Sequence, residues 1–191
     1  MKTEKIDRRV KYTKMLLKKS LVDLMRELPI SKISVKLLCD AADINRSTFY
    51  AHYTDQYDLL KQLEQEVIAE LEKHISKDAF TKQTAQTVKA LNQILDYIAK
   101  NTDLFKVLLS ENGNSTFQRE IMLLAQQKTI RALQSDQRID PRTSEYLQCF
   151  ATTGALSIMQ KWLQDGMVEP TEKMSELASK LLFKGLSAFY T

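Results

Sequence analysis

The chain has 191 residues, 43% of them hydrophobic, with only four glycines and three prolines, and this composition favours an all-α fold. Its net charge of +4 is unevenly distributed: residues 1–54 carry 12 Lys or Arg against 6 Asp or Glu, and the remaining residues carry 16 against 18. No apolar run approaches the roughly 20 residues that span a bilayer, and no signal peptide follows the basic N-terminus, so we expect a cytoplasmic protein with no membrane segment. A basic end of this kind suits a protein that meets a polyanion through that end.

The first predicted helix follows a charged N-terminal arm. It begins at about Arg8 and reaches about Leu28, where Pro29 blocks it. Its apolar side chains fall on one helical face, which should cover the elements that come next. Three basic residues at its start are either ordinary solvated charges or contacts to a phosphate: Arg8, Arg9 and Lys11.

The segment Ile33–Tyr53 predicts two short helices joined by a turn. Ser34 and Asn45 are good N-caps, so one helix should run from Val35 to Ala42 and the next should begin at Arg46. The side chains expected to face a core are those of Leu38, Ala42, Ile44 and Phe49. Those expected to point outward are Lys36, Arg46, Ser47, Thr48, Tyr50 and His52. This is helix-turn-helix geometry, in which the second helix presents its N-terminal residues to base edges.

These residues resemble the N-terminal domain of TetR/AcrR-type regulators. The matching pattern comprises Leu38, Ala42, Ile44, Asn45, Thr48, Phe49, Tyr50, His52, Tyr53, Leu59 and Leu60. By this resemblance Tyr50 and His52 contact phosphates, and the side chains nearest the bases are Arg46, Ser47 and Thr48. The full set expected to bind DNA is Ser34, Lys36, Asn45, Arg46, Ser47, Thr48, Tyr50 and His52. The chain departs from the family at Gln56, where many members have a lysine that meets the DNA backbone.

Further helices follow. A fourth helix is predicted from caps at Thr54 and Asp55 to about Lys77. Near its end lie one histidine and one carboxylate, His74 and Glu70. This pair lacks the further ligands that a metal site needs. The next predicted elements are a polar connection over 81–84, helices over about 85–100, 102–109 and 115–133, and a turn over 111–114. In that turn Gly113 is expected to supply a positive φ.

Two long helices are predicted at the C-terminus. Asp140 and Pro141 start the first, which should run to Asp165 and stop at Gly166, and Thr171 should cap the second. Together they carry more apolar surface than one subunit can bury, which favours a homodimer about a two-fold axis, as in TetR-type proteins. The expected dimer interface comprises Phe150, Gly154, Ile158, Leu177, Leu181 and Gly185.

The C-terminal half also resembles one subgroup of the same family. The similarity lies in the run Ser-Glu-Asn-Gly-Asn from Ser110, followed by Phe117, and in the run Trp-Leu-x-x-Gly-Met from Trp162. The resemblance implies a TetR-like all-α protein of about nine helices. A three-helix helix-turn-helix domain would occupy residues 1–54, and a helical ligand-binding and dimerisation domain residues 55–191.

Cys39 and Cys149 sit among apolar neighbours and are expected to be buried thiols.

An enzyme is disfavoured, and no cofactor or metal is expected. The sequence has no phosphate-cradling glycine loop, no Gly-x-Ser-x-Gly motif and no metal-ligand cluster, and it contains two histidines. We expect instead a sequence-specific transcriptional regulator, a repressor that binds an inverted repeat in double-stranded DNA.

By family resemblance, a small-molecule effector would release the DNA. No Arg or Lys cluster in the C-terminal region demands an acidic ligand, so we expect the effector to be mostly apolar and uncharged. Its pocket is expected to be lined by Tyr97, Phe105, Phe117, Met122, Met159 and Trp162, although such residues also fill the core of any helical bundle. The alternative is a DNA-bound adaptor or activator whose C-terminal domain binds a protein partner and has no small-molecule effector. A closed core without a cavity would favour that alternative.

Overall fold

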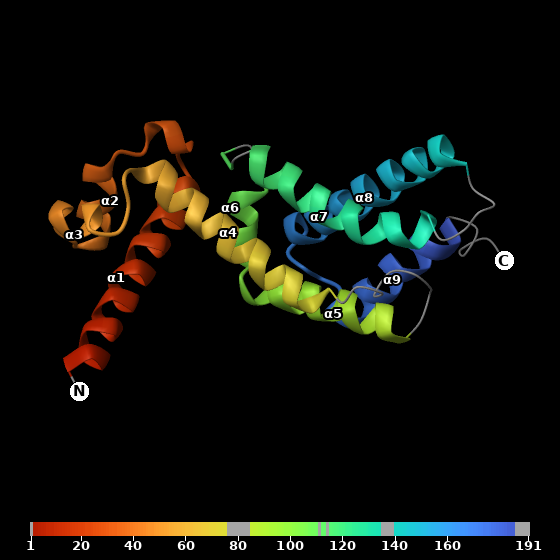
Figure 1. Ribbon diagram of the computed structural model, residues 1–191, viewed down its shortest axis with the longest axis horizontal. Coiled ribbons are helices and arrows are strands. Elements are labelled where there is room, and N and C mark those ends of the chain that lie inside the picture. Colours follow the sequence, from red (N-terminus) through yellow and green to blue (C-terminus); the bar gives the residue numbers. More distant parts are fainter. Residues whose placement is uncertain (1, 76–84, 111, 114, 135–139, 186–191) are drawn as a thin grey trace. The chain divides into compact units, whose positions relative to one another are not determined.

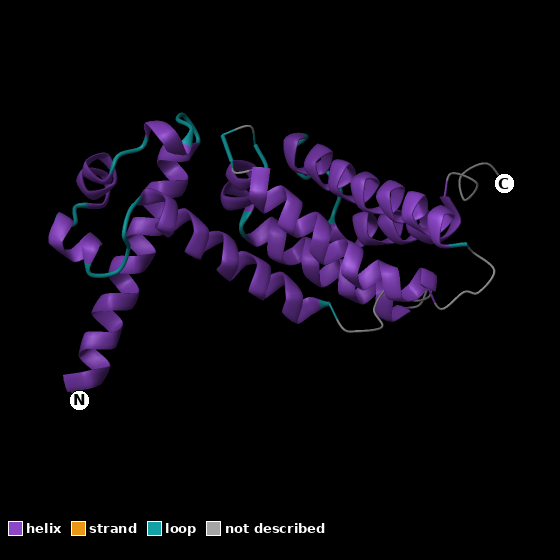
Figure 2. Ribbon diagram, turned by 45° about the horizontal axis from the view of Figure 1, so that its top comes forward, coloured by secondary structure: helices purple, strands orange, loops and turns teal. Residues whose placement is uncertain are grey.

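The computed structural model describes residues 2–75, 85–110, 112–113, 115–134 and 140–185. All the regular elements in these ranges are helices (Figure 2), which agrees with the predicted all-α class. The chain divides into two compact units. The first unit comprises Met1–Val67 and Val107–Asn114, and the second comprises Ile68–Lys106 and Ser115–Thr191.

The first unit is built around the helix-turn-helix (Figure 1). Its elements are α1 (Lys2–Met25), a short 3₁₀ helix (Ile30–Lys32), α2 (Val35–Ala42), α3 (Arg46–Tyr50) and the first part of α4 (Gln56–His74). Side chains from all four α-helices meet in its core. Those with no exposed surface include Leu17 and Leu21 of α1, Leu38 of α2, Phe49 of α3 and Leu59 of α4. Burial of each such side chain stabilises the fold by about 1.5–3 kcal/mol.

Both ends of α1 differ from the prediction. The helix begins at Lys2 instead of about Arg8, and it ends at Met25 instead of about Leu28. Steric clash with a following proline disfavours helical backbone at the preceding residue, so Leu28 cannot readily continue the helix into Pro29. The amides of Glu27 and Leu28 both donate to the carbonyl oxygen of Leu24, which closes the last turn.

The second unit is a helical bundle. It contains the end of α4, α5 (Ala85–Lys100), most of α6 (Thr102–Leu108), α7 (Ser115–Gln134), α8 (Pro141–Gln164) and α9 (Thr171–Lys184). Helix α5 packs along α9, and α7 packs along α8. The start of α8 is the predicted one: Asp140 accepts hydrogen bonds from the amides of Arg142 and Thr143 at 3.1 and 3.0 Å. The hydrogen bond with the Thr143 side chain is the largest influence that holds the pKa of the Asp140 carboxyl below its usual value, and these amide bonds add to it.

Two backbone predictions were wrong. Gly113 is not in the left-handed region; it is required because a Cβ there would lie 2.3 Å from the carbonyl oxygen of Leu108. Thr171 does not cap α9, because Pro170 occupies the cap position and Thr171 is the first helical residue. The Thr171 hydroxyl instead donates to Asp96 of α5 at 2.6 Å. The predicted connection over 81–84, the end of α4 at Lys77 and the turn residues 111 and 114 lie outside the described residues.

The two cysteines have different environments. Cys39 is buried, as predicted, whereas Cys149 is exposed on α8 and the prediction of a second buried thiol was wrong. The reason is the orientation of the first half of α8. Its buried residues are the polar Ser144, Gln148 and Thr152, so neighbouring apolar positions face outward.

Candidate nucleic-acid interface and ligand cavity

Local hydrogen bonds hold the two short helices of the first unit. The Ser34 hydroxyl accepts from the amide of Leu37 at 3.1 Å, and the Asn45 side-chain oxygen accepts from the amide of Ser47 at 3.0 Å. Both residues are therefore the N-caps that the sequence predicted. Between the helices Asp43 adopts the left-handed conformation, with φ 53°. This conformation turns the chain from α2 into α3.

Helix α3 presents polar side chains outward from a buried aromatic anchor. Phe49 has no exposed surface, and its ring lies 5.6 Å from the rings of both Tyr50 and Tyr53. Tyr50 is 58% exposed. The remaining predicted DNA-binding residues divide into two groups: Ser34, Lys36, Asn45, Arg46 and Ser47 are exposed, and Thr48 and His52 are half-buried. A surface with this many hydrogen-bond donors can meet both phosphates and base edges.

Tyr53 joins α1 to the end of the helix-turn-helix. It is 2% exposed, and the ammonium of Lys14 lies 5.8 Å from the centre of its ring. The pKa of Tyr53 is raised to about 12. Burial of the phenol is the largest cause, and the negative charges of Glu66 and Asp58 add to it. Lys18, one turn along α1, forms an ion pair with Glu66 of α4. The sequence pattern included Tyr53 but did not identify these contacts.

The start of α4 is fixed by two aspartates. Asp55 accepts a hydrogen bond from the amide of Asp58 at 2.8 Å, and Asp58 accepts from the amide of Thr54 at 3.0 Å. The side chain of Gln62 donates to the second oxygen of Asp58 at 3.0 Å. Gln56, the first residue of α4, is half-buried beside this loop. The loop after α3 therefore holds a defined conformation.

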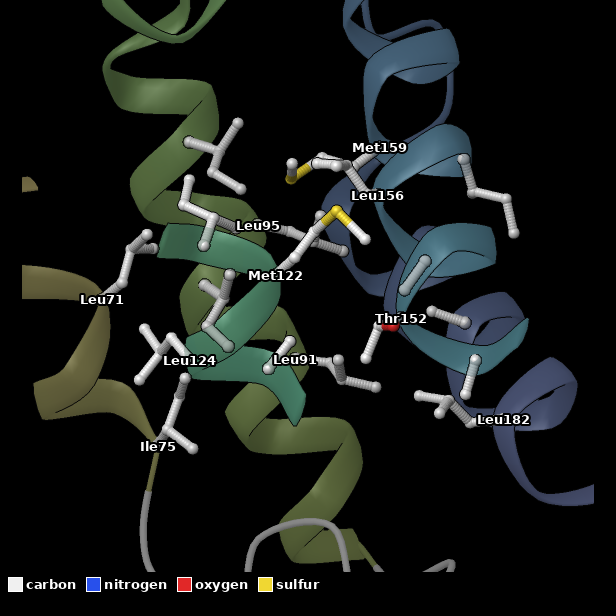
Figure 3. Close-up of a pocket in the computed structure, with 18 of the residues that line it drawn as sticks. Leu71, Ile75, Leu91, Leu95, Met122, Leu124, Thr152, Leu156, Met159 and Leu182 are labelled. Atoms are coloured by element: carbon white, nitrogen blue, oxygen red, sulfur yellow. The ribbon is translucent and has the colours of Figure 1, made fainter. Parts of the chain in front are cut away.

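The second unit contains an apolar cavity of about 170 Å³ (Figure 3). Its lining comes from α4 to α9 and consists of Leu71, Ile75, Leu91, Ile94, Leu95, Ile98, Phe105, Ile121, Met122, Leu124, Ala125, Ala151, Thr152, Ala155, Leu156, Ile158, Met159, Met174, Ala178 and Leu182. None of these side chains is charged. Among the described residues, the only hydroxyl in the lining is that of Thr152.

Three of the six residues predicted to line a pocket do line this cavity: Phe105, Met122 and Met159. The other three, Tyr97, Phe117 and Trp162, are not in its lining. Each has another environment. The Trp162 indole donates to the carbonyl of Glu169 at 2.9 Å, Phe117 is completely buried, and the Tyr97 ring packs against Phe105 at 5.7 Å. The presence of an aromatic side chain alone could not distinguish residues that line the cavity from residues that pack in the core.

The residues predicted to form a dimer interface lie on α8 and at α9. Phe150 is 71% exposed, and its neighbour Tyr146 on the preceding turn is 65% exposed. The other five, Gly154, Ile158, Leu177, Leu181 and Gly185, are half-buried, and Ile158 also lines the cavity. Neighbouring exposed aromatic side chains such as Tyr146 and Phe150 are typical of a protein–protein contact.

Two features are absent from the residues that the structure describes. No group of three or more His, Cys, Asp or Glu side chains is placed to hold a metal ion in that part of the chain. No helix described there is both long and apolar enough to cross a membrane.

Comparison with known proteins agrees with this arrangement. A TetR-type family model, described as "Transcriptional regulator C-terminal region", matches residues 85–184. A TetR transcriptional regulator from Streptococcus agalactiae is similar over 95% of this chain and 99% of its own, with 22% identity and a TM-score of 0.67. No match was found among curated proteins.

Two further solved structures have a similar fold. The transcriptional regulator FadR from Bacillus subtilis, solved in complex with stearoyl-CoA, has 14% identity and a TM-score of 0.65, over 90% of this chain and 98% of its own. The dihydroxyacetone kinase operon activator DhaS has 20% identity and a TM-score of 0.61, over 89% of this chain and 93% of its own.

At these identities the solved structures establish the fold, and the family model, which spans more than half of the chain, establishes the family. Members of this family are DNA-binding regulators and not enzymes, in agreement with the sequence analysis. The chain belongs to the TetR family of transcriptional regulators.

Proposed function

We propose that this regulator is a cytoplasmic homodimeric repressor that binds an inverted-repeat operator in double-stranded DNA and is released by a small apolar effector. The observation that carries the proposal is the outward, donor-rich face of α3 on a buried anchor, Phe49. A short helix held in this way presents its side chains in one orientation. Two copies related by a two-fold axis would read two half-sites about one duplex turn apart, roughly 34–36 Å.

The residues divide by role within this proposal. Arg46, Ser47 and Thr48 occupy the first turn of α3 and would contact base edges. Tyr50 and His52 follow at its end and would contact phosphates. The remaining members of the interface, Ser34, Lys36 and Asn45, begin α2 and α3, where exposed amides also favour an anion.

Dimerisation is supported by the outward apolar surface of α8. Phe150 and Tyr146 are more than 60% exposed in the single chain, and the polar Ser144 and Gln148 face inward. Burial of such a surface against a second copy would remove it from water. The interface would continue through Gly154, Ile158, Leu177, Leu181 and Gly185.

Release by an effector is supported by the cavity of the second unit. Leu71 and Ile75, at the end of α4, are part of its lining. The first part of α4 belongs to the unit that carries the helix-turn-helix. A ligand that shifts α4 would therefore act on an element that both units share.

A second candidate is an activator or adaptor that binds a protein partner through its C-terminal domain. The observation in its favour is the similarity to DhaS, which is named as an operon activator. The cavity argues for a small-molecule effector and against this alternative.

Footprinting on fragments of the host genome tests the proposal. We expect the full-length protein to protect a two-fold symmetric site and the double variant Tyr50→Ala with His52→Ala to lose at least tenfold in affinity for it. The variant Thr153→Ala, at an exposed position of α8, is the control. Protection without two-fold symmetry, or equal affinity of the double variant, would contradict the proposal. Reporter transcription with and without the protein separates a repressor from an activator.

A further inference from the structure

The cavity of the second unit is chemically selective because its lining is almost entirely hydrocarbon. Of the twenty lining residues that the structure describes, nineteen are Leu, Ile, Met, Ala or Phe, and the remaining one is Thr152. A carboxylate or phosphate in this space would lose its hydration without gaining a counter-ion from any of these described side chains, at a large cost in free energy. The cavity therefore selects against anionic ligands.

Its volume is that of a small ligand. An apolar cavity of roughly 150 Å³ is large enough to hold benzene, and this one has about 170 Å³. Met122 from α7 and Met159 from α8 extend into the space between these two helices (Figure 3). Thioether sulfurs make favourable contacts with aromatic rings, and methionine side chains adapt to the shape of a ligand. A single ring with a small substituent fits this space.

Thr152 is the one polar side chain among the described lining residues, and its hydroxyl already has a partner. Its hydroxyl donates to the carbonyl oxygen of Gln148 at 2.8 Å, with the carbonyl of Cys149 also within 3.4 Å. Because the one hydroxyl hydrogen is used in this way, the oxygen can only accept from a ligand. A phenolic O–H would satisfy it, whereas an ether oxygen would gain no hydrogen bond there.

We propose that this cavity binds a small, uncharged aromatic molecule with one hydrogen-bond donor, such as a phenol, and that Thr152 selects the donor. This inference rests on the proposed function, because it names the chemical class of effector for the same cavity. Binding to the cavity can nevertheless be measured without DNA.

Isothermal titration calorimetry of the full-length protein with four matched probes tests the ligand class. The probes are p-cresol, toluene, 4-methylanisole and 4-methylbenzoate. We expect p-cresol to bind about three- to tenfold more tightly than toluene, as one added hydrogen bond implies. The ether should bind no more tightly than toluene, and the carboxylate should give no detectable binding. Equal binding of p-cresol and toluene, comparable binding of the carboxylate, or no binding of any neutral probe would overturn the inference.

Three variants test the role of Thr152. Thr152→Val keeps the shape and removes the acceptor, so the preference for p-cresol over toluene should fall to about one while toluene still binds. Thr152→Ser keeps the hydroxyl and should keep the preference, which separates loss of the acceptor from loss of the fold. Thr153→Val, at the adjacent exposed position, is the matched control. A preference that survives in Thr152→Val would overturn the assignment of Thr152.

Addition of p-cresol to the protein–operator complex separates this inference from the proposed function. If p-cresol binds the cavity and leaves the complex intact, the ligand class stands and effector release fails. If none of the neutral probes binds and a different compound releases the DNA, effector release stands and the ligand class fails.

Discussion

The amide of Ile44 donates a hydrogen bond to the carbonyl oxygen of Cys39 at 3.0 Å, across the turn that ends α2. The amide of Asp43 bonds back to Asp40 at 3.4 Å, and Asp43 itself has φ 53°. This pair of bonds is the Schellman motif, which satisfies carbonyl groups that the helix end leaves without partners. It also sets the direction in which the chain enters α3.

The left-handed backbone at Asp43 gives the first prediction. Asp43→Gly should raise the free energy of unfolding by up to about 1 kcal/mol, and Asp43→Ala should lower it by a similar amount, because only glycine adopts this conformation without a steric cost. Urea unfolding followed by circular dichroism measures both. Asp40→Ala, inside α2, is the control and should not lower stability, since alanine favours helix. A destabilised Asp43→Gly variant would disprove the explanation.

A second prediction concerns Gln56, the first residue of α4. Gln56→Lys should strengthen DNA binding by adding one phosphate contact where relatives of the family have a lysine. Each such contact makes the slope of log K against log salt steeper by about 0.9. Fluorescence anisotropy at several salt concentrations gives this slope. Gln164→Lys adds the same charge at an exposed position of α8 and should leave the slope unchanged; an equal change in both variants would indicate only a net-charge effect.

A third prediction follows from Asp58. Its hydrogen bond from the Thr54 amide is the largest cause that lowers the pKa of this carboxyl, and the bond from Gln62 adds to it. The folded state therefore holds the proton less tightly than the unfolded state, whose carboxyl has a pKa of about 3.9. The stabilisation that these hydrogen bonds give the folded protein is present above the pKa of the unfolded state. It is lost as the pH falls through the lower pKa of Asp58 in the folded protein.

We expect Asp58→Asn to lower stability at pH 7 and to lose less stability than the parent between pH 5 and pH 2. Urea midpoints across that range measure the difference, and Asp40→Asn is the matched control. An unchanged pH profile in Asp58→Asn would show that this carboxyl is not responsible.

The exposed aromatic surface of α8 gives a fourth prediction. Phe150→Glu should shift the protein from dimer to monomer, because a charge in an apolar interface loses hydration without a partner. Sedimentation equilibrium should show at least a tenfold increase in the dimer dissociation constant. Gln164→Glu introduces the same charge near the end of the same helix and should leave the dimer intact. A monomeric parent, or a fully dimeric Phe150→Glu variant, would contradict the assigned interface.

The sequence alone determined the local structure of this protein well. Ser34, Asn45 and Asp140 cap their helices as predicted, because a capping bond joins residues two or three positions apart and needs no distant partner. The same locality explains why Leu38, Ala42 and Phe49 could be placed on the inward face, whereas Ile44, also predicted to face the core, is half-buried. The burial of Leu38 and Phe49 follows from helical spacing once the two starts are known.

Only the tertiary structure decided what depends on packing between distant segments. The inward polar face of α8, which leaves Cys149 exposed, depends on which side of that helix meets α7. The lining of the cavity depends on six helices at once, so residue type could not distinguish Phe105, which lines it, from Phe117, which does not. Gly113 likewise serves a close approach to Leu108, a contact that no turn rule predicts. Whether a side chain is buried depends on the residues that pack around it in the folded protein, and those residues are far apart in the sequence.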